Sequence, residues 1–253
     1  TGNIVENLLL SGNLSVTSDT AIALGNLTAD AVLTLSSNMD VSSAELTLSD
    51  SAELSLGTAN ITAYVTNPVI VDSTQKLKNG GGSFDFAGGI TLKSGSELVG
   101  QGQEISGNIS LSGGKLSIAQ DTIFADNLAI SAGSTINIDA LKTLTYDGAT
   151  VGIGAAVLKI QGGGTFINTE STELKLNSAN SNLVLDNVTV AYVSVSAASN
   201  SNKGLQVTAD STLTNLSLTQ KLRLSVAAEK TFSVTESLTV PTQGMLLSGS
   251  GML

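Results

Sequence analysis

The sequence predicts an all-β protein that folds as a parallel β-helix, also called a β-solenoid. Three observations predict this fold. A short corner motif returns along the chain, short runs alternate between aliphatic and polar residues, and glycine-rich turns return at a longer interval. Three aliphatic strand onsets succeed one another per repeat, so we expect three strands per coil of about 20 residues.

The corner motif contains an aliphatic residue, five mostly small or polar residues and a second aliphatic or aromatic residue that opens the next strand. Small and polar residues of this kind favour tight turns, so each copy predicts a corner between two strands. An antiparallel β-sandwich is the competing fold, but a sandwich has no need to reuse one corner sequence. The copies occupy residues 16–22, 48–54, 92–98, 130–136, 207–213 and 226–232.

The strands are predicted from alternation with a period of two, in which two aliphatic side chains share one face and a polar or charged one lies on the other. This pattern describes a strand that is buried on one side and solvated on the other. Only 3% of the residues are aromatic, so we expect an aliphatic core. The clearest alternating triplets are 46–48, 54–56, 109–111, 116–118, 136–138, 174–176, 188–190 and 222–224.

A second repeat, with a longer period, consists of three glycine turns near 80–84, 162–166 and 249–253. We interpret their glycines as structural, because glycine permits a positive φ or a close backbone approach at a tight corner. A phosphate-binding loop requires a lysine and then a serine or threonine directly after its glycines, and none of the three turns has this pair. We expect one solenoid domain over residues 1–253, with higher-order units punctuated by these turns. The structural glycines are Gly80, Gly82, Gly162, Gly164, Gly249 and Gly251.

Composition argues against catalysis, cofactor binding and metal binding. The chain has no histidine and no cysteine, and Arg223 is its only arginine. We therefore expect no catalytic, cofactor or metal residues, because the acidic residues are dispersed at about one per turn without a suitable base. The closest acidic pairs in sequence are Asp50 with Glu53 and Glu170 with Glu173. We interpret them as solvated turn charges.

The formal net charge of −10 argues against nucleic acid as a partner, because binding a phosphate backbone requires clustered lysine and arginine. No apolar run approaches the roughly 18 residues that a membrane span needs. We therefore expect neither nucleic-acid binding nor insertion of this segment into a membrane.

The chain resembles the passenger regions of bacterial autotransporters and filamentous-haemagglutinin-type exoproteins. The resemblance covers nearly the whole length and rests on repeat signatures: ISAGSTINI from Ile130, ISLSGGKLSI from Ile109, VTADSTL from Val207, and the turns GGGTF from Gly162 and GSGML from Gly249. Such regions are right-handed parallel β-helices that are displayed on or released from the bacterial surface, often as adhesins. The resemblance thus implies a right-handed solenoid at an extracellular or cell-surface location.

We expect a noncatalytic structural or adhesive rod, in which stacked coils form a stiff spacer of a bacterial surface or secreted fibre. No capping element is evident at either end of the sequence, so we expect either a segment of a longer protein or a subunit whose open coils stack end to end on a second copy. The other expected partner is a receptor on a host or neighbouring cell. The alternative functions are a polysaccharide-active β-helix and a glycan-binding or ice-binding one. A glycan-binding or ice-binding solenoid needs outward threonines aligned in regular rows, whereas the outward positions of this sequence mix threonine, serine, asparagine, lysine and arginine.

Overall fold

The structure, a computed structural model, describes residues 4–10, 14–17, 22–29, 32–36, 40–48, 52–56, 62–199, 203–242 and 244–252, and its account of side chains begins at residue 46. The chain is all β, with 59% of residues in strands and no α-helix among the described residues. Stacked parallel strands form a β-solenoid of about 9 turns that repeat roughly every 22 residues. The predicted fold class is therefore confirmed, and the coils are slightly longer than the predicted 20 residues.

The chain forms two compact units, Thr1–Asp126 and Asn127–Leu253. In each unit the strands belong to two faces, which we call sheet A and sheet B. The single-domain organisation expected from sequence stays a prediction.

Among the described residues of the first unit, sheet A contains ten strands and sheet B six. Sheet A contains β1 (Ile4–Leu10), β3 (Ile22–Ala29), β5 (Asp40–Leu48), β7 (Thr62–Val65), β8 (Val69–Val71), β10 (Ser83–Phe86), β11 (Ile90–Lys93), β13 (Ile105–Ser106), β14 (Ile109–Ser112) and β16 (Thr122–Phe124). Sheet B contains β2 (Leu14–Thr17), β4 (Val32–Ser36), β6 (Glu53–Ser55), β9 (Lys76–Lys78), β12 (Glu97–Gln101) and β15 (Lys115–Gln120).

In the part of the second unit that the structure describes, sheet A contains eight strands and sheet B six. Sheet A contains β17 (Leu128–Ile130), β19 (Thr143–Tyr146), β20 (Val151–Ile153), β22 (Thr165–Ile167), β23 (Leu174–Leu176), β25 (Thr189–Val195), β27 (Ser211–Leu218) and β29 (Phe232–Thr239). Sheet B contains β18 (Ser134–Ile138), β21 (Val157–Gln161), β24 (Asn182–Asp186), β26 (Gly204–Val207), β28 (Leu222–Val226) and β30 (Met245–Gly249). A single 3-10 turn, Glu170–Thr172, separates β22 from β23.

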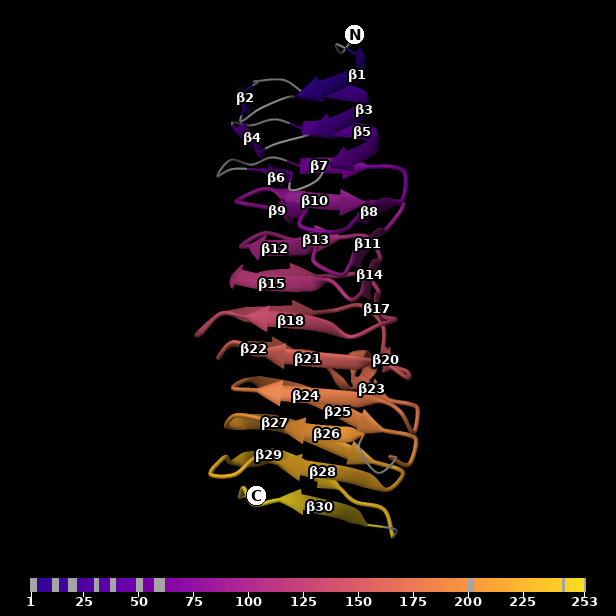
Figure 1. Cartoon of the computed structure of the whole chain (residues 1–253), viewed down its shortest axis with the longest axis vertical. Coiled ribbons are helices and arrows are strands. Elements are labelled where there is room, and N and C mark those ends of the chain that lie inside the picture. Colours follow the sequence, from indigo (N-terminus) through magenta and orange to yellow (C-terminus); the bar gives the residue numbers. More distant parts are fainter. Residues whose placement is uncertain are drawn as a thin grey trace. The chain divides into compact units, whose positions relative to one another are not determined.

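Each strand pairs in parallel with the equivalent strand of the next coil, as Figure 1 shows within each unit. The predicted three strands per coil occur where a polar turn interrupts sheet A, as between β22 and β23. In the next coil the single strand β25 pairs with both of them. Its sequence TVAYVSV contains no glycine, proline, asparagine or aspartate, so the backbone stays extended where the preceding coil turns, and this coil has two strands.

The inward positions of the strands form a continuous apolar core in each unit. The predicted alternation is confirmed, since the aliphatic ends of every triplet named above are buried. The expectation of a purely aliphatic core is incomplete, because all five phenylalanines and Tyr146 are also buried. Phe84 and Phe86 stack with their ring centroids 5.1 Å apart, and Tyr146 lies 6.1 Å from Phe166 of the next coil. The core thus contains six of the eight aromatic residues of the chain.

The corner motif forms corners, but not always the same one. Residues 92–98 and 130–136 lead from sheet A to sheet B, whereas 207–213 and 226–232 lead from sheet B to sheet A. The motif therefore specifies a bend between two buried strand ends and leaves the identity of the sheets open. The middles of the copies at 16–22 and 48–54 lie outside the described residues.

Within the part of the chain that the structure describes, no helix is long and apolar enough to span a membrane.

Candidate functional site

Gly162 and Gly164 shape the corner between β21 and β22. Gly162 has a φ of +114°, and a Cβ there would lie 2.4 Å from the carbonyl oxygen of Ile138. A Cβ on Gly164 would lie 2.3 Å from Cγ2 of Ile138 and 2.6 Å from the carbonyl oxygen of Asp139. The corner therefore needs a left-handed residue first and a close backbone approach two residues later.

Gly249 and Gly251 repeat that arrangement after β30. Gly249 has a φ of +98°, and its Cβ would lie 2.0 Å from the carbonyl oxygen of Val226. The Cβ of Gly251 would meet Cγ1 of Val226 and the carbonyl oxygen of Ala227, each at 2.4 Å. These two glycine turns thus occupy equivalent positions in their coils.

The first glycine turn has a different geometry. Gly80 has a φ of +58°, and Gly82 donates its N–H to the carbonyl oxygen of Asn79 at 2.6 Å. The Asn79 side chain is fully buried, accepts the N–H of Gln101 and donates to the carbonyl oxygen of Gln103. A buried asparagine therefore connects this corner to the backbone of the next coil.

An outward row of hydroxyl side chains crosses sheet A of the second unit, and we call it the hydroxyl row. Register places its members on successive strands, β19, β22, β25, β27 and β29, at about 4.8 Å per step. Each is half-buried, and the residue after the first four points into the core. The row consists of Thr143, Thr165, Thr189, Thr212 and Ser233.

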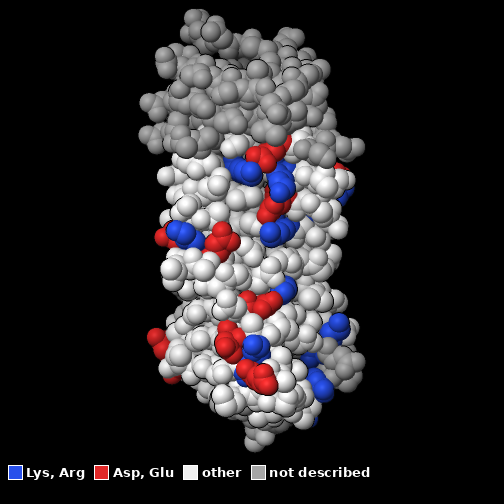
Figure 2. Space-filling view, turned by 60° about the vertical axis from the view of Figure 1, so that its left-hand side comes forward, with Lys and Arg blue, Asp and Glu red and all other residues white. Residues whose placement is uncertain are grey.

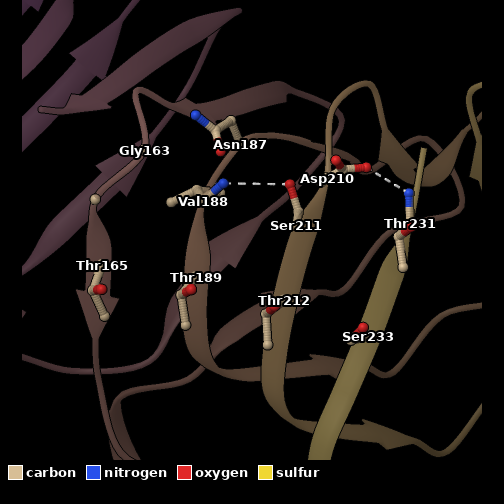
Figure 3. A pocket seen from close by; sticks show the side chains of 11 residues that line it. Gly163, Thr165, Asn187, Val188, Thr189, Asp210, Ser211, Thr212, Thr231 and Ser233 are labelled. Atoms are coloured by element: carbon tan, nitrogen blue, oxygen red, sulfur yellow. Dashed lines mark hydrogen bonds between the residues drawn. The ribbon is translucent and has the colours of Figure 1, made fainter. Parts of the chain in front are cut away.

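A groove of about 310 Å³ follows the last four members of the hydroxyl row. Figure 3 shows Thr165, Thr189 and Thr212 on adjacent strands with their side chains pointing the same way. The turns at the head of these strands line the other side of the groove with Asn187 and Asp210, among others.

The turn side of the groove is fixed by local hydrogen bonds. An Asp210 carboxylate oxygen accepts the backbone N–H of Thr231 at 2.7 Å (Figure 3). The backbone N–H of Val188 donates to the Ser211 hydroxyl at 3.4 Å. Asn187 adopts a left-handed φ of +55°, a conformation that asparagine tolerates better than most residues.

The residue types define what the groove can do. Each hydroxyl of the row can donate and accept a hydrogen bond, and Asn187 adds an amide. Asp210 is the single carboxylate among the lining residues, and Thr231 already engages it. Glycoside hydrolysis requires two opposed carboxyl groups, so this groove suits hydrogen bonding to a hydroxyl-rich surface rather than acid–base chemistry.

Sequence reasoning missed the hydroxyl row because the coil length varies. Consecutive members are 22, 24, 23 and 21 residues apart, so alignment at one fixed period mixes them with other outward residues. The available signal was a threonine or serine directly before an inward apolar residue, as in TLT, TFI, TVA, TLT and SVT.

The first unit carries a charged ladder on the outer face of sheet B. Glu97 lies between Lys76 and Lys115 of the adjacent strands, with N–O distances of 3.1 and 2.9 Å. Lys78 pairs with Glu53 at 2.8 Å. Figure 2 shows acidic and basic side chains side by side on one face. The ladder pairs opposite charges across coils.

Glu97 has an unusually acidic carboxyl group. Burial by itself would raise its pKa, but hydrogen bonds from Ser117, Lys115 and Lys76 outweigh burial and lower the pKa to about 2. The carboxylate therefore stays ionised to low pH and stabilises the coil contacts.

Two of the acidic residues named from the sequence pair with lysines in the structure. Glu53 pairs with Lys78, and Glu173 with Lys175 at 3.5 Å, whereas Asp50 lies outside the described residues. Glu170 lies in the exposed 3-10 turn. Among the residues that the structure describes, no three metal-ligating side chains gather closely enough to hold an ion.

Comparisons of the chain with protein-family models, with curated proteins and with solved structures find no match.

Proposed function

We propose that this chain is a noncatalytic structural and adhesive rod of a bacterial surface or secreted fibre. The observation that carries the proposal is the parallel pairing of coil on coil over an apolar core, in both units. Each coil buries its inner face against its neighbours, so resistance to deformation is distributed along the stack. Such a stack suits a stiff spacer.

The cell-surface setting is part of the same proposal. The corner and glycine-turn signatures resemble passenger regions of autotransporters and filamentous-haemagglutinin-type exoproteins, and the β-solenoid is consistent with that resemblance. The chain has no cysteine and an acidic net charge of −10, which suit an exported, soluble surface fibre.

The proposed partners are a second copy of this chain or a receptor on a host or neighbouring cell. Apolar side chains in β29 and β30 and just beyond them are exposed, and a further coil stacked on them, of the same protein or of a second copy, would cover them. Leu238, Leu247 and Met252 are 47%, 52% and 66% exposed, although Leu247 occupies an inward position of its strand. A further coil would bury them at about 25 cal/mol per Å² of apolar surface.

Electron microscopy and cell attachment test the proposal together. We expect the purified chain to form uniform rods, alone or joined end to end, and beads coated with it to attach to cells. The hydrophilic double variant Leu238→Ser, Leu247→Ser should shorten any joined rods without changing attachment. Globular particles, or turnover of a polysaccharide by the chain, would refute a noncatalytic rod.

A second candidate, binding of a neutral glycan or of ice, is favoured by the hydroxyl row alone. Thr189→Val removes one hydroxyl from the middle of the row at nearly constant shape. The candidate predicts a glycan-array signal or thermal hysteresis that Thr189→Val weakens, while Thr145→Val, outside the row on β19, leaves it unchanged. Absence of both signals in the unaltered chain would reject this candidate.

A further inference from the structure

Arg223 lies on the outer face of sheet B in the second unit. It occupies the second position of β28, between Leu222 and Leu224, which are fully buried. Its side chain therefore points away from the core. On the next strand, its register partner is Leu246, which offers no charge.

A small pocket of about 150 Å³ opens beside Arg223. Lys203, Gln206, Ser225 and Leu205 line it with Arg223. Gln206 and Ser225 are register partners on β26 and β28, so their polar side chains lie next to each other.

Gly204, between the lining residues Lys203 and Leu205, allows the backbones of β26 and β28 to approach closely next to the pocket. It has a φ of +124°, and a Cβ there would lie 2.4 Å from the carbonyl oxygen of Arg223. The backbones approach too closely for a side chain at this position, so nothing from residue 204 covers the arginine.

Charge compensation sets this pocket apart from the rest of sheet B. The described lysines within sheet B strands face carboxylates: Lys76 and Lys115 pair with Glu97, Lys78 with Glu53, and Lys159 with Asp186 at 2.6 Å. Among the described residues, neither Lys203 nor Arg223 has a carboxylate within 4.0 Å. Two cationic residues thus line one pocket without a carboxylate partner in the part of the chain that the structure describes, although the whole chain has a net charge of −10.

We propose that this pocket binds the carboxylate of an acidic sugar. The planar guanidinium of Arg223 matches a carboxylate with two parallel hydrogen bonds, and Lys203 adds a second positive charge. The Gln206 amide and the Ser225 hydroxyl can donate to and accept from the hydroxyls of the same sugar ring. Two cations are too few for a nucleic-acid backbone, which requires an extended row of phosphate contacts.

The ligand class is therefore an oligosaccharide that contains uronic acid. This inference deepens the proposed adhesive role and rests on it, because it supplies a chemical target for surface recognition. It differs from the neutral-glycan candidate in its face and chemistry, since the hydroxyl row lies on sheet A and carries no positive charge.

Isothermal titration calorimetry with trigalacturonic acid, and with neutral galactotriose as its control, tests the proposal. We expect the unaltered chain to bind the acidic trisaccharide and not the neutral one. Arg223→Gln should weaken binding at least tenfold, and Lys203→Gln severalfold. The matched control is Lys142→Gln, which makes the same charge change in the turn before β19, outside the pocket.

Three outcomes would overturn the site. These are no binding of trigalacturonic acid by the unaltered chain, equal binding of galactotriose, or equal weakening by Lys142→Gln and Arg223→Gln. Circular dichroism melting of each variant shows whether a loss of binding reflects unfolding. If Arg223→Gln unfolds, Lys203→Gln carries the test. If only this inference fails, beads coated with the unaltered chain still attach to cells. If these beads do not attach, the result counts against the proposed function itself.

Discussion

Replacing Gly164 by alanine tests how tightly successive coils approach at a glycine turn. The added Cβ would lie 2.3 Å from Cγ2 of Ile138, against an ordinary carbon–carbon contact of about 3.5–4.0 Å. It would also lie 2.6 Å from the carbonyl oxygens of Asp139 and Lys142. Gly164 does not have a positive φ, so the expected cost comes from the close approach.

The neighbours have little freedom to move away. Ile138 is fully buried. The Lys142 carbonyl accepts the N–H of Thr165 at 2.8 Å, and the Asp139 carbonyl accepts the N–H of Lys142 at 3.0 Å. Relief of the clash must therefore disturb backbone hydrogen bonds as well as packing, which places the cost near the upper end of overpacking, about 3 kcal/mol.

Urea unfolding followed by circular dichroism measures this cost. With a denaturant slope of about 2 kcal/mol per M, we expect the midpoint of Gly164→Ala to fall by about 1.5 M. Gly154→Ala is the matched control, because nothing lies within 4 Å of its added Cβ and its φ is not positive. Its midpoint should stay level or rise slightly. Equal midpoints for the two variants would refute the argument from close approach.

Three further predictions concern other contacts between coils. Glu97→Gln should lower the free energy of unfolding by about 1–2 kcal/mol at pH 7, allowing for solvent screening. Since folding lowers the pKa of Glu97 from 4.5 to about 2, the stability difference between the variant and the unaltered chain should be present above pH 4.5 and vanish as the pH falls to 2. Urea midpoints that differ equally at pH 7 and at pH 2 would contradict this prediction. Leu111→Asp should lower the free energy of unfolding by at least about 4 kcal/mol because it places a charge in the core. The outward Ser110→Asp should change it by about 0.5 kcal/mol or less. Similar melting temperatures of the two variants in thermal melts would contradict the assignment of Leu111 to the inner face and Ser110 to the outer face. Asn168→Leu should lower the free energy of unfolding by about 2–4 kcal/mol, because the buried Asn168 amide accepts the N–H of Tyr192 and donates to its carbonyl, each at 2.9 Å. Hydrogen exchange at the backbone amide of Tyr192 should accelerate at least tenfold in this variant. Unchanged protection of that amide would exclude the bridge.

Much of the architecture could be predicted from sequence because its signals are local. A strand such as Ile136–Ile138 within β18 needs only alternation to define its buried face, and a corner such as 130–136 needs only small residues between two aliphatic ends. The same locality limited the prediction. The motif does not encode which sheet follows the bend, so 130–136 and 207–213 have similar sequences and opposite directions between the sheets.

The candidate sites depend on contacts between residues about one coil apart, which no local pattern reports. Thr165 and Thr189 become neighbours only because an extra turn lengthens the intervening coil to 24 residues. In the sequence Arg223 stands two residues after Lys221, and only the structure shows that Lys203, about one coil earlier, lines a pocket together with Arg223.

The fold class, the inward faces of the strands and the places where the chain bends follow from the chemistry of a few consecutive residues, so they could be read from the amino acids alone. Which outward side chains share a row, which charges are paired and which glycines face a neighbouring backbone became visible only in the folded chain. These features depend on register, which is set by the summed lengths of all turns in a coil, and a shift of one residue moves every outward side chain to the opposite face.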